Sequence, residues 1–257
     1  MSPAGNINRL KAKLGRGETA VGLSCALGSA QIAEEFALAG FDYVYIDQQH
    51  GMTSQDTLLG MLRAIARSST TPLVRVAENN AALIGQALDA GAEGIIVPMV
   101  NTADDARRAV DACQYHPEGR RSWGPIRARY GLGADPEVVN REVLCLVMIE
   151  TAEALANVDE IVSTPGVDGV YLGPADLGIS LGFAPLAFEQ TTEPAQFAAI
   201  ERIRLACAGA DRIMGISGDP GNLSAAGFRM ITAGMDAMLI RSAIAGITRL
   251  DPVPRTP

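Results

Sequence analysis

The chain has 257 residues, of which 48% are hydrophobic and 19% are charged, and its formal net charge is −8. This composition indicates a globular protein with a large core, and the acidic balance without a basic patch argues against a nucleic-acid partner. The four cysteines form no CxxC pair, which argues against a zinc site or a disulfide framework and favours free thiols in a reducing compartment.

The first segment, "MSPAGNINRLKAKLGRGE", contains basic residues but no apolar core. A signal peptide is therefore not expected. No apolar run approaches the roughly 18 residues that a membrane span needs. We expect a cytoplasmic protein without a membrane partner.

Eight short runs rich in Val, Ile and Leu follow, and amphipathic segments separate several of them. Strands buried on both faces appear as continuous apolar runs and need helical crossovers. Eight βα units in about 250 residues match a (β/α)8 TIM barrel. The runs are 19–27 (TAVGLSCAL), 41–47 (FDYVYID), 72–76 (PLVRV), 94–100 (GIIVPMV), 143–150 (VLCLVMIE), 167–174 (VDGVYLGP), 211–217 (DRIMGIS) and 236–242 (DAMLIRS).

A doubly wound open sheet is the main alternative to the barrel. Its dinucleotide-binding version is weakened because no GxGxxG follows the first run. No Pro/Ser-rich linker divides the chain. We therefore predict an α/β fold in which residues 1–257 form a single (β/α)8 barrel domain, with a short N-terminal helix and a loose C-terminal tail, "RLDPVPRTP".

Polar side chains stand at the ends of the predicted strands, where a TIM barrel carries its active site. Asp47 and His50 follow the second strand, and Arg75 lies on the third. Glu150 ends the fifth strand, and Asp176 follows the sixth. Each also has an ordinary structural explanation, as a loop hydrogen bond, an ion pair or a helix cap. Their grouping at one rim favours a functional site.

The grouped residues suit metal-assisted enolate chemistry on a 2-oxo acid. Glu150 and Asp176 could ligate a hard divalent cation that polarises a carbonyl group. Arg75 would stabilise negative charge on an oxygen, and His50 would transfer a proton, since imidazole titrates near neutral pH. No lysine stands at a predicted strand end, which argues against a Schiff-base aldolase.

Several distinct motifs occur in order across most of residues 15–245, among them "DYVYIDQQHG", "PLVRVAENN", "ALDAGAEGIIVPMV" and "VMIETAEALANVDEIVSTPGVDGVYLGPADLGISLG". Together they resemble the HpcH/HpaI family of metal-dependent (class II) pyruvate aldolases. The resemblance implies a barrel whose last helix is exchanged between partner subunits, in a homo-hexamer built as a trimer of dimers. It also implies reversible cleavage of 4-hydroxy-2-oxo acids to pyruvate, or a close 2-oxo acid, plus an aldehyde.

The same motifs imply a role for each matching residue. His50 is expected to be the catalytic base, accompanied by Asp47, with Asp89 increasing its basicity. Arg75 is expected to stabilise the enolate and to contact substrate. Glu150 and Asp176 are the expected ligands of Mg²⁺, Mn²⁺ or Co²⁺, and the remaining substrate contacts are Met148, Gly173, Pro174 and Ala175.

Two positions depart from the family pattern. Gln49 stands where the family often has Glu before the histidine, and Met148 replaces a glutamine that touches substrate in some members. These departures leave the natural aldehyde, the stereoselectivity and the pathway open. The loop 119–131, "GRRSWGPIRARYG", is either a solvated loop or a lid or subunit contact.

Three other functions fit part of the same pattern. Oxaloacetate decarboxylation would use the same metal, arginine and base. An acyl-CoA lyase would want added basic residues for the diphosphate, and the acidic composition offers little support for it. A barrel that binds a 2-oxo acid without turnover would lack the base, and His50 argues against it.

Overall fold

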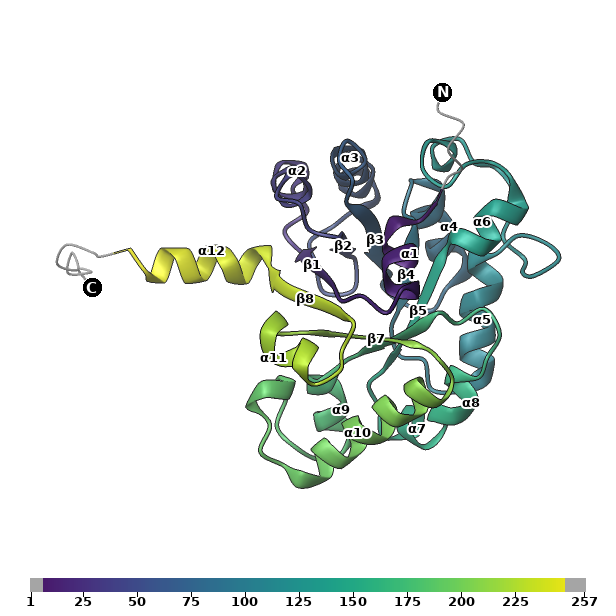
Figure 1. Ribbon diagram of the computed structural model, residues 1–257. Helices are drawn as coiled ribbons and strands as arrows, with labels where there is room; N and C mark the ends of the chain where they lie inside the picture. Colours follow the sequence, from purple (N-terminus) through teal and green to yellow (C-terminus); the bar gives the residue numbers. More distant parts are fainter. Residues whose placement is uncertain (1–6, 248–257) are drawn as a thin grey trace, which may run out of the picture.

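Eight parallel strands close into a barrel in the computed structural model, which describes residues 7–247 (Figure 1). Each strand pairs with its neighbours in chain order, and the last pairs back with the first. The predicted TIM barrel is therefore confirmed. The strands are β1 (Ala20–Cys25), β2 (Tyr43–Asp47), β3 (Thr71–Arg75), β4 (Gly94–Val97), β5 (Leu144–Ile149), β6 (Gly169–Leu172), β7 (Ile213–Ser217) and β8 (Met230–Met235).

Helices precede, connect and follow these strands. They are α1 (Arg9–Gly15), α2 (Ala30–Leu38), α3 (Gln55–Ile65), α4 (Ala81–Asp89), α5 (Ala103–Cys113), α6 (Pro136–Glu142), α7 (Ala152–Ala156), α8 (Val158–Val162), α9 (Pro174–Ser180), α10 (Pro194–Gly209), α11 (Pro220–Ala225) and α12 (Asp236–Ala245). Two single turns of 3₁₀-helix, η1 (Ala128–Tyr130) and η2 (Phe188–Gln190), lie in the longer connections. No helix of the described part is long and apolar enough to cross a membrane.

Local sequence signals explain where several helices begin. A capping box opens α3, in which Ser54 and Thr57 bond each other's backbone N–H groups through their side chains. Proline lies in the first turn of α6, α9, α10 and α11, where its missing N–H costs nothing. Pro174 therefore starts α9 directly after β6, and this places Ala175 and Asp176 in the first turn at the strand's carboxyl end.

Alternation along the strands divides the core in two. Val44 and Ile46 point outward and pack under the helices, whereas Tyr43 and Tyr45 point into the barrel lumen. Leu10 and Leu14 of α1 belong to the lumen cluster as well. The other members of that cluster are Ala20, Leu73, Ile96, Leu144, Leu146, Met148, Tyr171 and Met230. The lumen is thus a packed core, and only the carboxyl ends of the strands are free to build a site.

Two glycines make room for tyrosine rings in the lumen. Gly22 pairs with Tyr43 across β1 and β2, and a Cβ at Gly22 would lie 2.5 Å from the Tyr43 carbonyl oxygen and 2.6 Å from its ring. Gly215 pairs with Tyr171 across β7 and β6, and a Cβ there would lie 2.9 Å from the Tyr171 ring. Each large ring occupies the space that its neighbour's missing side chain leaves.

The predicted eighth strand is wrong. Residues 236–242 begin α12, and β8 is the preceding segment Met230–Met235. A short apolar run such as "DAMLIRS" fits a strand or a helix equally well, and Gly234 made the true strand look like a turn. Asp236 is the first residue of α12, and its side chain accepts hydrogen bonds from the backbone N–H groups of Ala26 and Leu27.

Helix α12 extends away from the barrel (Figure 1). Its large apolar residues Met238, Leu239, Ile240 and Ile244 are all exposed, between 42% and 62%. Beside its start, an apolar groove is lined by residues of α2, including Ile32 and Phe36. The predicted C-terminal tail, "RLDPVPRTP", lies outside the described residues.

Candidate active site

Asp47 and Arg75 form a two-pronged ion pair at the carboxyl end of the barrel. They face each other in register on β2 and β3. The Arg75 Nε donates to Asp47 Oδ1 at 2.9 Å, and Nη2 donates to Oδ2 at 2.6 Å. The side chains are 14% and 2% exposed. This burial lowers the pKa of Arg75, but the hydrogen bonds that Arg75 donates to Asp47, together with the negative charge of Asp47, outweigh that effect, so the pKa is raised overall and the guanidinium stays charged.

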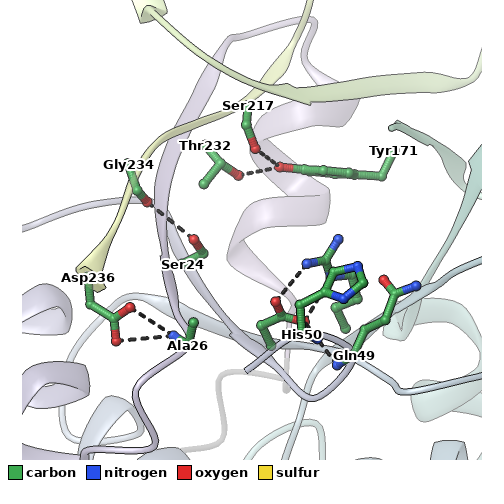
Figure 2. Close-up of polar contacts among 11 residues, drawn as sticks. Ser24, Ala26, Gln49, His50, Tyr171, Ser217, Thr232, Gly234 and Asp236 are labelled. Atoms are coloured by element: carbon green, nitrogen blue, oxygen red, sulfur yellow. Dashed lines mark hydrogen bonds and ion pairs between the residues drawn. The ribbon is translucent and has the colours of Figure 1, made fainter. Parts of the chain in front are cut away.

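The histidine loop is fastened to the same ion pair. Asp47 Oδ1 also accepts the backbone N–H groups of Gln49, at 3.0 Å, and His50, at 3.3 Å. Gly51 permits this turn, because a Cβ there would lie 2.1 Å from the Asp47 carbonyl oxygen. Figure 2 shows the side chains of His50 and Gln49 next to each other in this loop. His50 is exposed, so its imidazole is open to a substrate at the mouth of the barrel.

Glu150 is a buried carboxylate at the end of β5, only 1% exposed. Its Oε1 accepts the Met99 N–H at 2.7 Å, and Oε2 lies 2.6 Å from where a Cβ of Gly173 would be. Burial raises the pKa of Glu150, Asp176 raises it further, and Arg75 lowers it. The carboxylates of Glu150 and Asp176 and the guanidinium of Arg75 therefore form one electrostatic group.

These two carboxylates fit a hard divalent cation. Their oxygens are the ligand type that Mg²⁺ and Mn²⁺ prefer. The negative charge of Asp176 raises the pKa of Glu150, and a bound cation would offset this repulsion between the two carboxylates. Among residues 7–247, no group of three or more His, Cys, Asp or Glu side chains could hold a metal. A cation on Glu150 and Asp176 would thus keep positions open for water and substrate oxygens.

Met148 forms part of the apolar base of the site. It is 2% exposed, belongs to the lumen cluster and pairs in register with Tyr171. Its Cε lies 3.3 Å from where a Cβ of Gly173 would be, so it packs directly under the loop that begins α9. The side chain offers a substrate no hydrogen-bond donor at this point.

A network of hydroxyl groups beneath the site was missed by the sequence analysis. The Tyr171 hydroxyl lies 2.8 Å from Ser217 Oγ and 2.7 Å from Thr232 Oγ1 (Figure 2). Thr232 Oγ1 is also 2.8 Å from the Tyr43 hydroxyl. Counting back by twos from Asp47 would have placed Tyr45 and Tyr43 on the same lumen face, because strand side chains alternate.

Asp89 lies away from His50 in this chain. Helix α4 starts beside the carboxyl end of β3 and runs back along the barrel, so its last residue lies near the opposite edge. There Asp89 Oδ1 accepts Arg121 Nη2 at 2.7 Å, and the Arg121 guanidinium stacks 4.7 Å from the Tyr115 ring centroid. Part of the loop 119–131 is therefore packed, whereas its Trp123 is 58% exposed.

Comparisons with known proteins agree with this architecture. Residues 21–243 match the model of the HpcH/HpaI aldolase/citrate lyase family. A 2-keto-3-deoxy-L-rhamnonate aldolase of Escherichia coli O6:K15:H31 is 36% identical over 92% of this chain and 90% of its own length. A hydroxypyruvate/pyruvate aldolase of Rhizorhabdus wittichii is 41% identical, covering 82% and 85%. The crystal structure of an HpcH/HpaI aldolase/citrate lyase family protein from Burkholderia cenocepacia is 32% identical with a TM-score of 0.82, covering 93% and 97%.

Proposed function

The chain belongs to the HpcH/HpaI aldolase/citrate lyase family, and we propose that it is a class II pyruvate-type aldolase. It cleaves 4-hydroxy-2-oxo acids to a small 2-oxo acid and an aldehyde, and it runs the reverse addition. The observation that carries this proposal is the shared electrostatic group of Arg75, Glu150 and Asp176 at the barrel mouth, with His50 fastened beside it through Asp47.

Each residue of the group has a part in the chemistry. A divalent cation held by Glu150 and Asp176 would polarise the 2-oxo group of the substrate. The Arg75 guanidinium stabilises negative charge that develops on the carbonyl oxygen as the enolate forms. His50, exposed at the mouth, moves the proton between substrate and solvent. The family motif assigns the substrate carboxylate to the backbone of Ala175, with Gly173 and Pro174 beside it.

The side chains of the site and the named relatives indicate a class of metal ion and a class of substrate. The two carboxylates suit Mg²⁺, Mn²⁺ or Co²⁺. The relatives named above act on 2-keto-3-deoxy-L-rhamnonate and on hydroxypyruvate or pyruvate, and we propose the same class of small 2-oxo acid here. Met148 gives the site an apolar wall where a glutamine would offer an N–H, so a less polar partner is favoured at that point.

Two features of the chain support a proposal for its assembly. We propose that the exposed apolar face of α12 packs on a partner subunit, in a homo-oligomer of the family's hexameric, trimer-of-dimers type. Because Asp89 lies near the opposite edge from the chain's own His50, any effect of Asp89 on a histidine's basicity would have to act on a second copy.

Deuterium exchange at the pyruvate methyl group tests the proposal without knowledge of the aldehyde. In D₂O with Mn²⁺ or Mg²⁺, the protein should exchange the methyl protons, as followed by proton NMR, and chelation should stop the exchange. The variant H50A should bind Mn²⁺ normally but exchange slowly, whereas H116A, which removes the chain's other histidine, should behave as wild type. Absence of exchange from folded protein with every metal would refute the aldolase assignment.

A further inference from the structure

The guanidinium of Arg75 lies over the ring of Tyr45. Its Cζ is 5.8 Å from the ring centroid, within the range of a cation–π interaction. Tyr45 precedes Asp47 by two residues on the same strand, so both side chains project to the lumen face. The ring therefore supports Arg75 from the floor of the barrel, while Asp47 holds it from the side.

The Tyr45 ring is itself held by its neighbours. It is 5% exposed and meets Tyr171 edge to face, with ring centroids 5.9 Å apart and planes at 75°. The hydroxyl of Tyr171 is fixed by Ser217 and Thr232, as Figure 2 shows. A line of contacts thus runs from the hydroxyl network through two aromatic rings to the arginine.

The hydrogen bonds to Asp47 alone do not prevent the guanidinium plane of Arg75 from tilting. Asp47 binds Nε and Nη2, and among the described residues Nη1 makes no hydrogen bond. Nη1 is therefore available to a substrate oxygen. The two hydrogen bonds to Asp47 act as a hinge about which the guanidinium plane can tilt, and a tilt would swing Nη1 away from its target. A ring beneath the guanidinium opposes that tilt, and Tyr45 occupies this place.

We propose that Tyr45 is a positioning residue for the aldolase reaction: its ring holds the guanidinium plane of Arg75 so that Nη1 meets the oxygen on which negative charge develops. This inference rests on the proposed function for its kinetic consequence. It differs from the family-implied roles because it assigns a part to an aromatic side chain in the lumen. Donors positioned in advance of the reaction stabilise a transition state without reorganising.

Substitutions at Tyr45 separate the ring from its hydroxyl. The variants Y45L and Y45M remove the ring, and Y45F keeps it. We expect Y45L and Y45M to lower kcat by about 5- to 30-fold, the range that a desolvated cation–π contact supports. The KM for the 2-oxo acid and the affinity for Mn²⁺ should change by less than about twofold, because Glu150 and Asp176 are untouched, and Y45F should restore kcat.

A matched control comes from the same strand. Tyr43 is a buried lumen tyrosine two residues earlier; its hydroxyl is hydrogen-bonded to Thr232, and it makes no cation–π contact with Arg75. Y43L should lower the melting temperature at least as much as Y45L does but leave kcat within about twofold. Equal losses of kcat in Y43L and Y45L, normal turnover in both Y45L and Y45M, or a Y45F as slow as Y45L would each overturn the proposal.

Crystal structures of Y45L and Y45M test the positioning role of Tyr45 without an activity assay, and therefore separately from the proposed function. If wild-type protein shows no methyl exchange, the aldolase assignment fails, and the orientation of Arg75 can still be measured. We expect the guanidinium plane to tilt in at least one of these variants while its contact with Asp47 persists. An unchanged guanidinium in both would refute the positioning role.

Discussion

Replacing Asp47 by Asn removes one negative charge from the centre of the site and keeps the side chain's shape. The amide oxygen can still accept the N–H groups of Gln49 and His50, so the change isolates the interaction with Arg75. The Arg75 side chain, which is only 14% exposed, then keeps its positive charge but loses the carboxylate that it is paired with. Breaking a buried ion pair in this way costs about 3 kcal/mol, because the remaining charge has lost its hydration as well as its partner.

A double-mutant cycle measures this coupling. Urea unfolding, followed by circular dichroism at one protein concentration, gives the free energy of unfolding for wild type, D47N, R75M and D47N/R75M. We expect D47N to lose about 3 kcal/mol and the double variant to lose less than the sum of the single changes, by about 2 kcal/mol. A loss below about 1 kcal/mol in D47N, or additive losses, would show that the pair is not held as the structure describes.

Three further predictions concern stability. Burial raises the pKa of Glu93 to about 7 from 4.5, so the neutral form of its side chain is favoured in the folded state. The free energy of unfolding of the wild type should therefore fall by about 3 kcal/mol as the pH rises from about 4.5 through 7, whereas that of E93Q should not. Urea unfolding midpoints at pH 5 and pH 8 test this difference. G22A should cost about 2–3 kcal/mol or prevent folding, because the new methyl group meets the backbone of Tyr43, whereas G15A, with no atom within 4 Å, should leave the melting temperature nearly unchanged. T232V should cost about 1–3 kcal/mol in urea unfolding because it deprives the Tyr43 hydroxyl of its partner, and T232S should recover most of that loss.

The sequence was sufficient for most of the barrel because seven of its strands are continuous apolar runs bounded by amphipathic helices. The exception, β8, is interrupted by Thr232 and Gly234, whereas the helix that follows it contains the unbroken apolar run 237–240, so the apolar-run pattern favoured the wrong segment. A strand that lines a polar network loses the signal by which buried strands are recognised.

The site residues at strand ends could be predicted from the sequence, but the contacts that hold them in place could not. Asp47, Arg75 and Glu150 were found because a charge inside an apolar run needs a partner. The hydrogen bonds of Asp47 to the backbone of Gln49 and His50 depend on a turn that Gly51 permits, and no pattern in the sequence encodes its geometry. The cation–π contact of Tyr45 required knowing which lumen layer faces Arg75.

The fit between glycines and tyrosines in the lumen constrains how this barrel can change during evolution. An alanine at position 22 is compatible only with a residue at position 43 that leaves space for it, and positions 215 and 171 are linked in the same way. The first substitution of either pair is harmful on its own, whichever comes first. Each pair should therefore vary jointly among relatives, and such covariation would trace the interior of the barrel in sequences for which no structure exists.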